Sequence, residues 1–275
     1  MAESSASPAA ARYIVGVDGS VPSYAALDWA GRHARDEGAT VVLVHVADPE
    51  PDAEEGDGEI DACAAGREVL AAARARMTEA FPEVGVETRI LTGPPAWALA
   101  EAATEGDTLV IGTGKTGYVT GRVLGSRSVQ IALAAPGTVA VIPEGDPRLR
   151  SGVIAGIDRA ETAARIATCA ASEARDRDMR LTLVHAIKPE GAHAARAGDD
   201  GPLAVAADAA RSAGDHLEIR SRVSTRPPAE ALLDASRSAA LLVVGPGATE
   251  PHRSPLGSTL HSVLLNANAP VLVVR

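Results

Sequence analysis

The chain is poor in aromatic residues, cysteine and lysine. Its 275 residues include one Phe, three Tyr, two Trp and two Cys, and Lys occurs only at positions 115 and 188. Two cysteines far apart in the sequence exclude a disulfide framework or a zinc knuckle, so we expect free thiols in a reducing compartment. With 46% hydrophobic residues and few aromatics, the core must consist of Val, Leu, Ile and Ala.

Long apolar runs and an excess of positive charge are also absent. No run approaches the length that crosses a membrane, and residues 1–11 lack the basic start and apolar core of a signal peptide. The formal net charge of -10 argues against nucleic acid and anionic membranes as partners, because both bind basic patches. We therefore expect a cytoplasmic protein with a disordered tail over residues 1–11.

A strand followed by a glycine-rich loop is the most informative stretch of the chain. The apolar run Leu109–Ile111 leads into glycines at 112, 114, 117, 121 and 125, and a helical pattern then runs to Ala135 with Ser126 at or near its N-cap. Glycines leave backbone N–H groups uncovered, and a helix N-terminus adds donors and partial positive charge. The pattern therefore predicts a site for phosphate or another anion.

This loop is not a P-loop, although Gly114-Lys115-Thr116 resembles the end of one. That motif needs glycine at position 109, where the chain has Leu109. Lys115 has two interpretations: its ammonium group binds phosphates as a point charge, which we favour, or its side chain blocks the pocket.

Apolar runs alternate with helical patterns along the first half of the chain. Strands are predicted at 13–17, 41–46, 86–91, 109–111 and 138–142, with helices after each of the first four. This order predicts an α/β fold with an open parallel sheet and helices on both faces. Residues 48–61 carry many carboxylates and precede a helix predicted at 62–80. We favour a solvated loop there over a divalent-ion loop.

The whole pattern occurs twice. Val17-Asp18 recurs as Ile157-Asp158 at a spacing of 140, and Leu124-Gly125-Ser126 recurs as Leu256-Gly257-Ser258 at 132. The chain is therefore a tandem duplication, with domains at 12–143 and 151–275 and a linker at 144–150. The decrease in spacing predicts that repeat two is shortened between 188 and 215.

Two histidines and two tryptophans have less specific interpretations. His45 recurs as His185, and we interpret both as core histidines with satisfied hydrogen bonds. Trp29 and Trp97 are predicted to pack in a core or an interface.

These motifs resemble the universal stress protein family in its tandem form. Gly16-Val17-Asp18-Gly19-Ser20 matches the end of the family's first strand, Leu43-Val44-His45-Val46 its second, and Gly112 to Ser126 its nucleotide loop, Gly-x2-Gly-x9-Gly-Ser/Thr. The resemblance implies two Rossmann-like, five-stranded parallel sheets of order 3-2-1-4-5. It also implies ATP or another adenine nucleotide, with or without Mg²⁺, where the first and fourth strands part.

The resemblance assigns roles by position. Asp18 and Val46 match the adenine end of the site, and residues 112–115 and 125–128 match the ribose and phosphate end. The predicted binding residues are Val17, Asp18, Gly19, Ser20, Val46, Gly112, Thr113, Gly114, Lys115, Gly125, Ser126, Arg127 and Ser128. No catalytic or metal-ligating side chain is predicted.

Repeat two departs from the family pattern. Arg159-Ala160 replaces the Gly-Ser pair, and its glycine loop is one residue shorter, with prolines at 246, 251 and 255. Prolines remove N–H donors, so we expect a degenerate second site that is weak or empty.

The resulting functional hypothesis is an adenine-nucleotide-binding protein of stress response or signalling, with little or slow hydrolysis. Between Gly112 and Ser128 no carboxylate, Gln or His is available as a general base. The alternatives are a slow ATPase or phosphotransferase, and a partner-binding scaffold without nucleotide. The resemblance also implies an intramolecular pseudo-dimer, paired through the last strands, that forms a homodimer.

Overall fold

The computed structural model describes residues 11–47, 57–114, 126–145, 149–187, 201–213, 216–247 and 257–275, with the side chains of 57–61 and 126 excepted. Repeat one contains β1 (Arg12–Gly16), α1 (Val21–Glu37), β2 (Thr40–Ala47), α2 (Asp57–Ala80), β3 (Val86–Thr92), α3 (Pro95–Ala102), β4 (Asp107–Thr113), α4 (Ser126–Ala134) and β5 (Thr138–Pro143). Repeat two contains β6 (Val153–Ile157), α5 (Ala160–Arg175), β7 (Leu181–Ala186), α6 (Pro202–Ser212), β8 (Ile219–Ser224), α7 (Pro228–Ala235), β9 (Leu241–Val244), α8 (Ser258–Asn266) and β10 (Val271–Val273).

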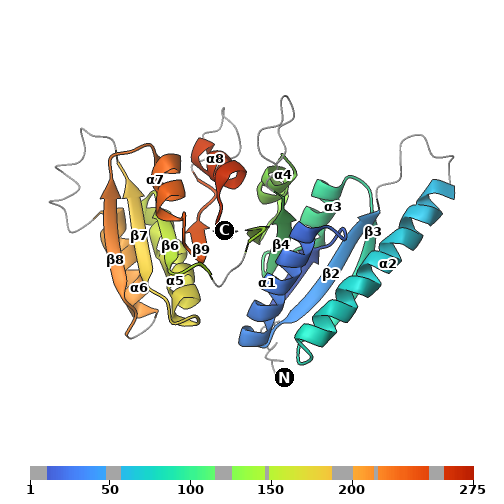
Figure 1. Cartoon of the computed structure of the whole chain (residues 1–275). Helices are drawn as coiled ribbons and strands as arrows, with labels where there is room; N and C mark the ends of the chain where they lie inside the picture. The colour runs from blue at the N-terminus through green and yellow to red at the C-terminus, as the bar shows by residue number, and fades with distance from the viewer. Residues whose placement is uncertain are drawn as a thin grey trace, which may run out of the picture.

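The strands form a single ten-stranded sheet (Figure 1) in the order β3-β2-β1-β4-β5-β10-β9-β6-β7-β8. Each half has the predicted order 3-2-1-4-5 with parallel pairing. The prediction of two separate sheets was wrong, because β5 pairs with β10 in antiparallel fashion and joins the two halves into one sheet. This junction is the intramolecular pairing through the last strands that the resemblance implied.

A local two-fold axis passes through the junction. Ala140 of β5 pairs with Leu272 of β10, and the two residues are 132 apart, the spacing that relates the two glycine loops. Val139 and Val141 pair with Val273 and Val271 on either side. Ala140 therefore meets its own equivalent, and Val139 and Val141 each pair with the equivalent of the other, as at the interface of a symmetric dimer.

Helices cover both faces of this sheet. The buried residues of α1, α2, α5 and α6 form one hydrophobic cluster, and those of α3, α4, α7 and α8 form the other. Strands between two such layers are buried on both sides, which explains the continuous apolar run Val41–Val44. Both clusters include residues of both repeats, so the halves share their cores.

Some sequence expectations need correction. Helix α2 begins at Asp57, five residues before the predicted start, and residues 48–56 of the acidic segment lie outside the described part. Helix α6 has 11 residues where α2 has 24, in the region predicted to be shortened. Trp29 is buried, but Trp97 is 60% exposed because it lies on the outer side of α3.

None of the described helices is long and apolar enough to span a membrane.

Candidate functional site

In repeat one the predicted site begins at the turn between β1 and α1. The Val17 N–H donates to the carbonyl of Val44 at 2.9 Å, which holds the turn beside the end of β2. Gly19 has a φ of 78°, a left-handed conformation that favours glycine. Ser20 is the N-cap of α1, since its hydroxyl accepts a hydrogen bond from the Ser23 N–H at 3.4 Å. The N-terminus of α1 therefore opens at the carboxyl edge of the sheet.

The Asp18 carboxylate is fixed within this turn. Its Oδ1 accepts hydrogen bonds from the Ser20 N–H at 3.0 Å and from the Ser20 hydroxyl at 2.5 Å. Partial burial raises the pKa of Asp18, but the hydrogen bonds from Ser20 outweigh it and the net pKa is lowered. Asp18 is therefore an oriented, ionised acceptor at neutral pH.

Strand β4 ends against the first turn of α1, and this contact requires glycine. A Cβ on Gly112 would lie 2.1 Å from the carbonyl oxygen of Pro22 and 2.7 Å from the Ser23 nitrogen. Among the residues that the structure describes, a Cβ on Gly114 would meet only the Pro22 side chain, at 3.4 Å. Gly112 thus lets the backbone that leaves β4 approach the turn that carries Asp18.

The structure brings together the parts of the predicted site that it describes. Residues 17–20, Val46 and residues 112–114 lie at or just beyond the carboxyl ends of β1, β2 and β4, which are neighbours in the sheet. Helix α4 begins at Ser126, where a helix start was predicted, with Arg127 exposed and Ser128 buried. Lys115, Gly125 and the side chain of Ser126 lie outside the described residues.

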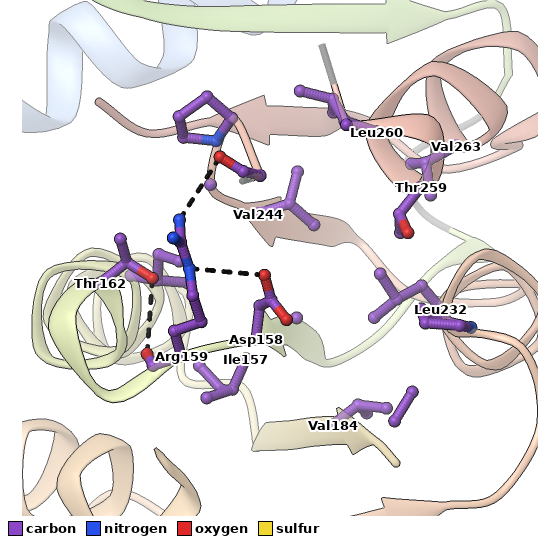
Figure 2. Close-up of a pocket in the computed structure, with 18 of the residues that line it drawn as sticks. Ile157, Asp158, Arg159, Thr162, Val184, Leu232, Val244, Thr259, Leu260 and Val263 are labelled. Atoms are coloured by element: carbon purple, nitrogen blue, oxygen red, sulfur yellow. Dashed lines mark hydrogen bonds and ion pairs between the residues drawn. The ribbon is translucent and has the colours of Figure 1, made fainter. Parts of the chain in front are cut away.

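At the equivalent place in repeat two, the structure contains a cavity of about 610 Å³, shown in Figure 2. Its lining includes Asp158, Ala186, Gly245, Pro246, Gly247, Gly257 and Ser258. Asp158 and Ala186 follow Asp18 and Val46 by 140 residues. The volume falls within the range of small-molecule sites, about 300–1,000 Å³.

The glycine segments correspond in the same way. Residues 245–247 follow 112–114 by 133 positions, and residues 257–258 follow 125–126 by 132. The cavity of repeat two therefore occupies the position of the site that the sequence predicts in repeat one.

The cavity has an apolar and a polar part: in Figure 2, Leu232, Leu260 and Val263 lie across from Arg159 and Thr162. The apolar lining consists largely of Ile157, Val184, Leu232, Val244, Leu260 and Val263. On the polar side, the Arg159 guanidinium donates from Nη2 to the carbonyl of Gly247 at 3.5 Å, and its Nε lies 3.7 Å from Oδ2 of Asp158. This combination suits a ligand with a flat apolar part and an anionic part.

One histidine in each repeat hydrogen-bonds to the backbone just before the site aspartate. His45 Nδ1 lies 2.8 Å from the carbonyl oxygen of Val17, and His185 Nδ1 lies 2.7 Å from that of Ile157. A carbonyl only accepts, so each Nδ1 carries the proton. Both histidines have satisfied hydrogen bonds, as predicted, but they are partly exposed and not core residues, and they fix the residue before the site aspartate. Their recurrence at a spacing of 140 was the signal for this positioning role.

Among the described residues, no three His, Cys, Asp or Glu side chains lie close enough together to hold a metal ion. Both cysteines are free, as predicted.

Comparison with known proteins gives a consistent picture. The model of the Universal stress protein family matches residues 11–143 and 152–275. Universal stress protein Rv3134c of Mycobacterium tuberculosis is 36% identical over 135 residues, which cover 47% of this chain and 50%, about half, of that relative. Universal stress protein Rv1996 of the same organism is 29% identical over 95% of this chain and 94% of its own length.

Among solved structures, a universal stress protein from Archaeoglobus fulgidus covers 96% of this chain and 98% of its own, with a TM-score of 0.73 and 19% identity. At this identity the likeness shows a shared fold.

Proposed function

This chain belongs to the universal stress protein family, and we propose that it binds adenine nucleotides at the carboxyl edge of its sheet, with ATP in repeat one. Under this proposal it is a stress-response or signalling protein, in which occupancy of the nucleotide site changes the surface presented to a protein partner.

The cavity in repeat two is the observation that carries the proposal. Its lining includes the counterparts of most of the residues predicted to bind nucleotide in repeat one, namely Ile157, Asp158, Arg159, Ala186 and residues 245–247 and 257–260. It also lies beside the ends of β6 and β9, adjacent strands that correspond to β1 and β4. Ligands of open α/β sheets bind beyond the carboxyl ends of the strands, at the point where the strand order reverses.

In repeat one, the predicted residues supply the groups that such a ligand needs. The oriented carboxylate of Asp18 accepts hydrogen bonds from the adenine end or the ribose, and Val46 packs against the base. Gly112 and Gly114 leave backbone N–H groups uncovered for the phosphates. Arg127, exposed at the start of α4, and Lys115 add positive charge for a triphosphate, with or without Mg²⁺.

We assign this protein little or slow hydrolysis. Rapid phosphoryl transfer needs a group that activates or orients the nucleophile next to the terminal phosphate. The sequence from Gly112 to Ser128 contains no Asp, Glu, Gln or His, so bound ATP acts as a ligand in this proposal. The proposal further includes a cytoplasmic location and a homodimer built on the intramolecular pseudo-dimer.

The two lysines of the chain provide a matched test of ATP binding. Lys115→Ala and Lys188→Ala remove the same charge, but only Lys115 lies in the nucleotide loop. Loss of a charge-assisted hydrogen bond of about 1.5–3 kcal/mol predicts an affinity for ATP that is at least about tenfold lower for Lys115→Ala. Lys188→Ala should bind ATP like the unmodified chain.

Other results separate the alternatives. Intact ATP binding by Lys115→Ala with lost turnover would favour an enzyme. Absence of ATP binding by the unmodified protein would favour a scaffold, and tighter binding by Lys115→Ala would show that this side chain blocks the pocket.

A further inference from the structure

The described sheet ends in two edge strands, β3 and β8, which lie at opposite ends of the molecule in Figure 1. Near β3, the carbonyl of Gly85 accepts a hydrogen bond from the Val41 N–H at 2.9 Å, so this carbonyl points toward β2. Successive peptide groups of a strand point in opposite directions. The backbone N–H and C=O groups of Val86, Thr88 and Ile90 therefore point outward, where a strand of another chain can pair with them.

The helices on the two faces of the sheet leave the edge of β3 open. Val86 and Ile90 pack against the hydrophobic cluster of α1 and α2, yet Thr88, on the same face between them, is exposed. At the end of the strand, a groove of about 620 Å³ is lined by residues of α2, β3 and α3. The described helices therefore do not cover this edge.

The sequence of β3 is complementary to itself when two copies run antiparallel about Thr88. In that register Thr88 lies opposite Thr88 of the second copy, and the outward backbone groups exchange hydrogen bonds there and at Val86 opposite Ile90. Glu87 lies opposite Arg89 of the second copy, and Arg89 opposite Glu87. Both side chains are exposed on one face of the strand, 3.6 Å apart within the chain. Opposite charges and paired threonines both stabilise an antiparallel sheet.

Strand β8 occupies the equivalent edge of repeat two without this complementarity. Arg220 and Arg222 follow Glu87 and Arg89 by 133 residues, and both are exposed. In the matching register, each arginine would lie opposite an arginine of the second copy, which destabilises a sheet. Glu218, 2.7 Å from Arg220, reduces this repulsion without reversing its sign. The charges of β8 therefore oppose self-pairing, as edge charges commonly do, whereas those of β3 favour it.

We propose that β3 is a self-association surface, at which two copies of the chain pair antiparallel about Thr88 and join their ten-stranded sheets into one. The fold already contains a joint of this kind, since β5 and β10 pair antiparallel about a local two-fold axis. A two-fold pairing uses the same patch on both copies and closes with two chains. The inference rests on the homodimer of the proposed function, for which it names the surface, and it does not depend on nucleotide.

The test is the mass of the full chain in solution, measured by analytical ultracentrifugation over a range of concentrations. We expect the unmodified chain to form a dimer. Glu87→Arg and Arg89→Glu should each raise the dissociation constant of this dimer at least about tenfold, because two pairs of opposite charge become pairs of like charge. The double variant Glu87→Arg/Arg89→Glu should recover most of the affinity, since it restores both pairs in reverse.

Two controls lie on β8. Arg220→Ala removes a charge at the position equivalent to Glu87 and should leave the dissociation constant unchanged. Thr88→Pro removes an outward N–H at the centre of the proposed pairing and should abolish the dimer. Ser221→Pro makes the same change at the equivalent position of β8 and should leave the dimer intact. Urea unfolding of both proline variants checks that the chain remains folded.

The inference is overturned if neither charge variant weakens the dimer, or if the double variant binds no more tightly than the single variants. Open-ended assemblies would also overturn it, because they would indicate pairing of β3 with β8. A chain that binds ATP but remains monomeric at every concentration would overturn this inference and leave ATP binding intact. A dimer that responds as expected but binds no nucleotide would overturn the proposed ATP site alone.

Discussion

His33 of α1 and Glu173 of α5 lie 3.4 Å apart, from Nε2 to Oε2, and they occupy equivalent positions, 140 residues apart, in the two repeats. Their side chains are only 7% and 12% exposed, and Arg177 contacts both. Two copies of the same repeat would place identical residues opposite each other here. A histidine facing a glutamate therefore favours pairing of repeat one with repeat two over pairing of like repeats.

The first prediction exchanges these two residues. His33→Glu places two carboxylates together at a buried position and should lower the free energy of unfolding by about 2–4 kcal/mol. Adding Glu173→His to His33→Glu should recover part of that loss, because the pair is restored in reverse. Urea unfolding measures both effects. Glu161→His, on the exposed side of α5, is the control and should have little effect on the free energy of unfolding. Additive effects of the two substitutions would contradict the coupling.

The second prediction concerns acid stability. Burial raises the pKa of Glu173, but His33 and Arg177 outweigh it and lower the pKa below its ordinary value of 4.5. Because the unfolded chain binds this proton more readily, the stabilisation is present above about pH 4.5 and decreases as the pH falls further toward the lowered pKa. Glu173→Gln should therefore lose less stability than the unmodified protein between about pH 5 and pH 3.

Asp107 is an independent case of a carboxylate whose pKa is lowered in the folded protein. Its carboxylate accepts two hydrogen bonds from Arg12, both of 2.8 Å, and two from Thr104. Burial raises the pKa of Asp107, but these partners lower it overall. Unfolding by urea across the acidic range, with Asp107→Asn beside Glu173→Gln, tests both groups. If the free energy of unfolding of each variant falls with pH in parallel with that of the unmodified protein, these carboxylates are not responsible for the loss of stability in acid.

The third prediction compares two glycines of the nucleotide loop. Gly112→Ala would push a methyl group into the backbone of Pro22 and Ser23, so it should displace the start of α1, cost about 1–3 kcal/mol of stability and abolish ATP binding in repeat one. Within the described part of the chain, the added methyl group of Gly114→Ala meets only the ring of Pro22, so this variant should be tolerated. Unfolding and ATP titration of the two variants give the comparison. Equal behaviour would show that the contact between β4 and α1 does not shape the site.

The fourth prediction separates the two cysteines by reactivity. Both are partly exposed, but burial, reinforced by Glu173 and Glu37, raises the pKa of Cys169 to about 12. Only the thiolate attacks thiol reagents, so a maleimide at neutral pH should label Cys63 and leave Cys169 unmodified until the protein unfolds. Native Cys63→Ser protein should therefore remain unlabelled. Rapid labelling of that variant would contradict the assigned environment of Cys169.

The fold could be predicted from the sequence largely because of its periodicity. The spacings of 140, 133 and 132 residues revealed the duplication, and apolar runs such as Val41–Val44 marked strands buried on both faces. Shared positions between the repeats and the family then implied the strand order. The start of α2 was missed because its first turn is acidic and lacks apolar residues at helical spacing.

The candidate site was less accessible to sequence analysis. The turn at Asp18 and the glycines after β4 were found because their residue types are specific to tight backbone contacts. For repeat two the sequence predicted a degenerate site, weak or empty, since its prolines and Arg159 indicated the loss of a family motif, and it gave no indication of the cavity's size. The pairing of His33 with Glu173 depends on the local two-fold axis, and no pattern within either repeat shows which residues lie beside that axis.

The measurement that tests the central claim most directly is calorimetric titration of the purified full chain with ATP, ADP, AMP and cyclic AMP, with and without Mg²⁺. Our account predicts saturable binding of adenine nucleotides, with ATP bound at one site per chain that is weakened by Lys115→Ala. Absence of both binding heat and a thermal shift at millimolar nucleotide would contradict it, and would show that the protein acts without a nucleotide ligand.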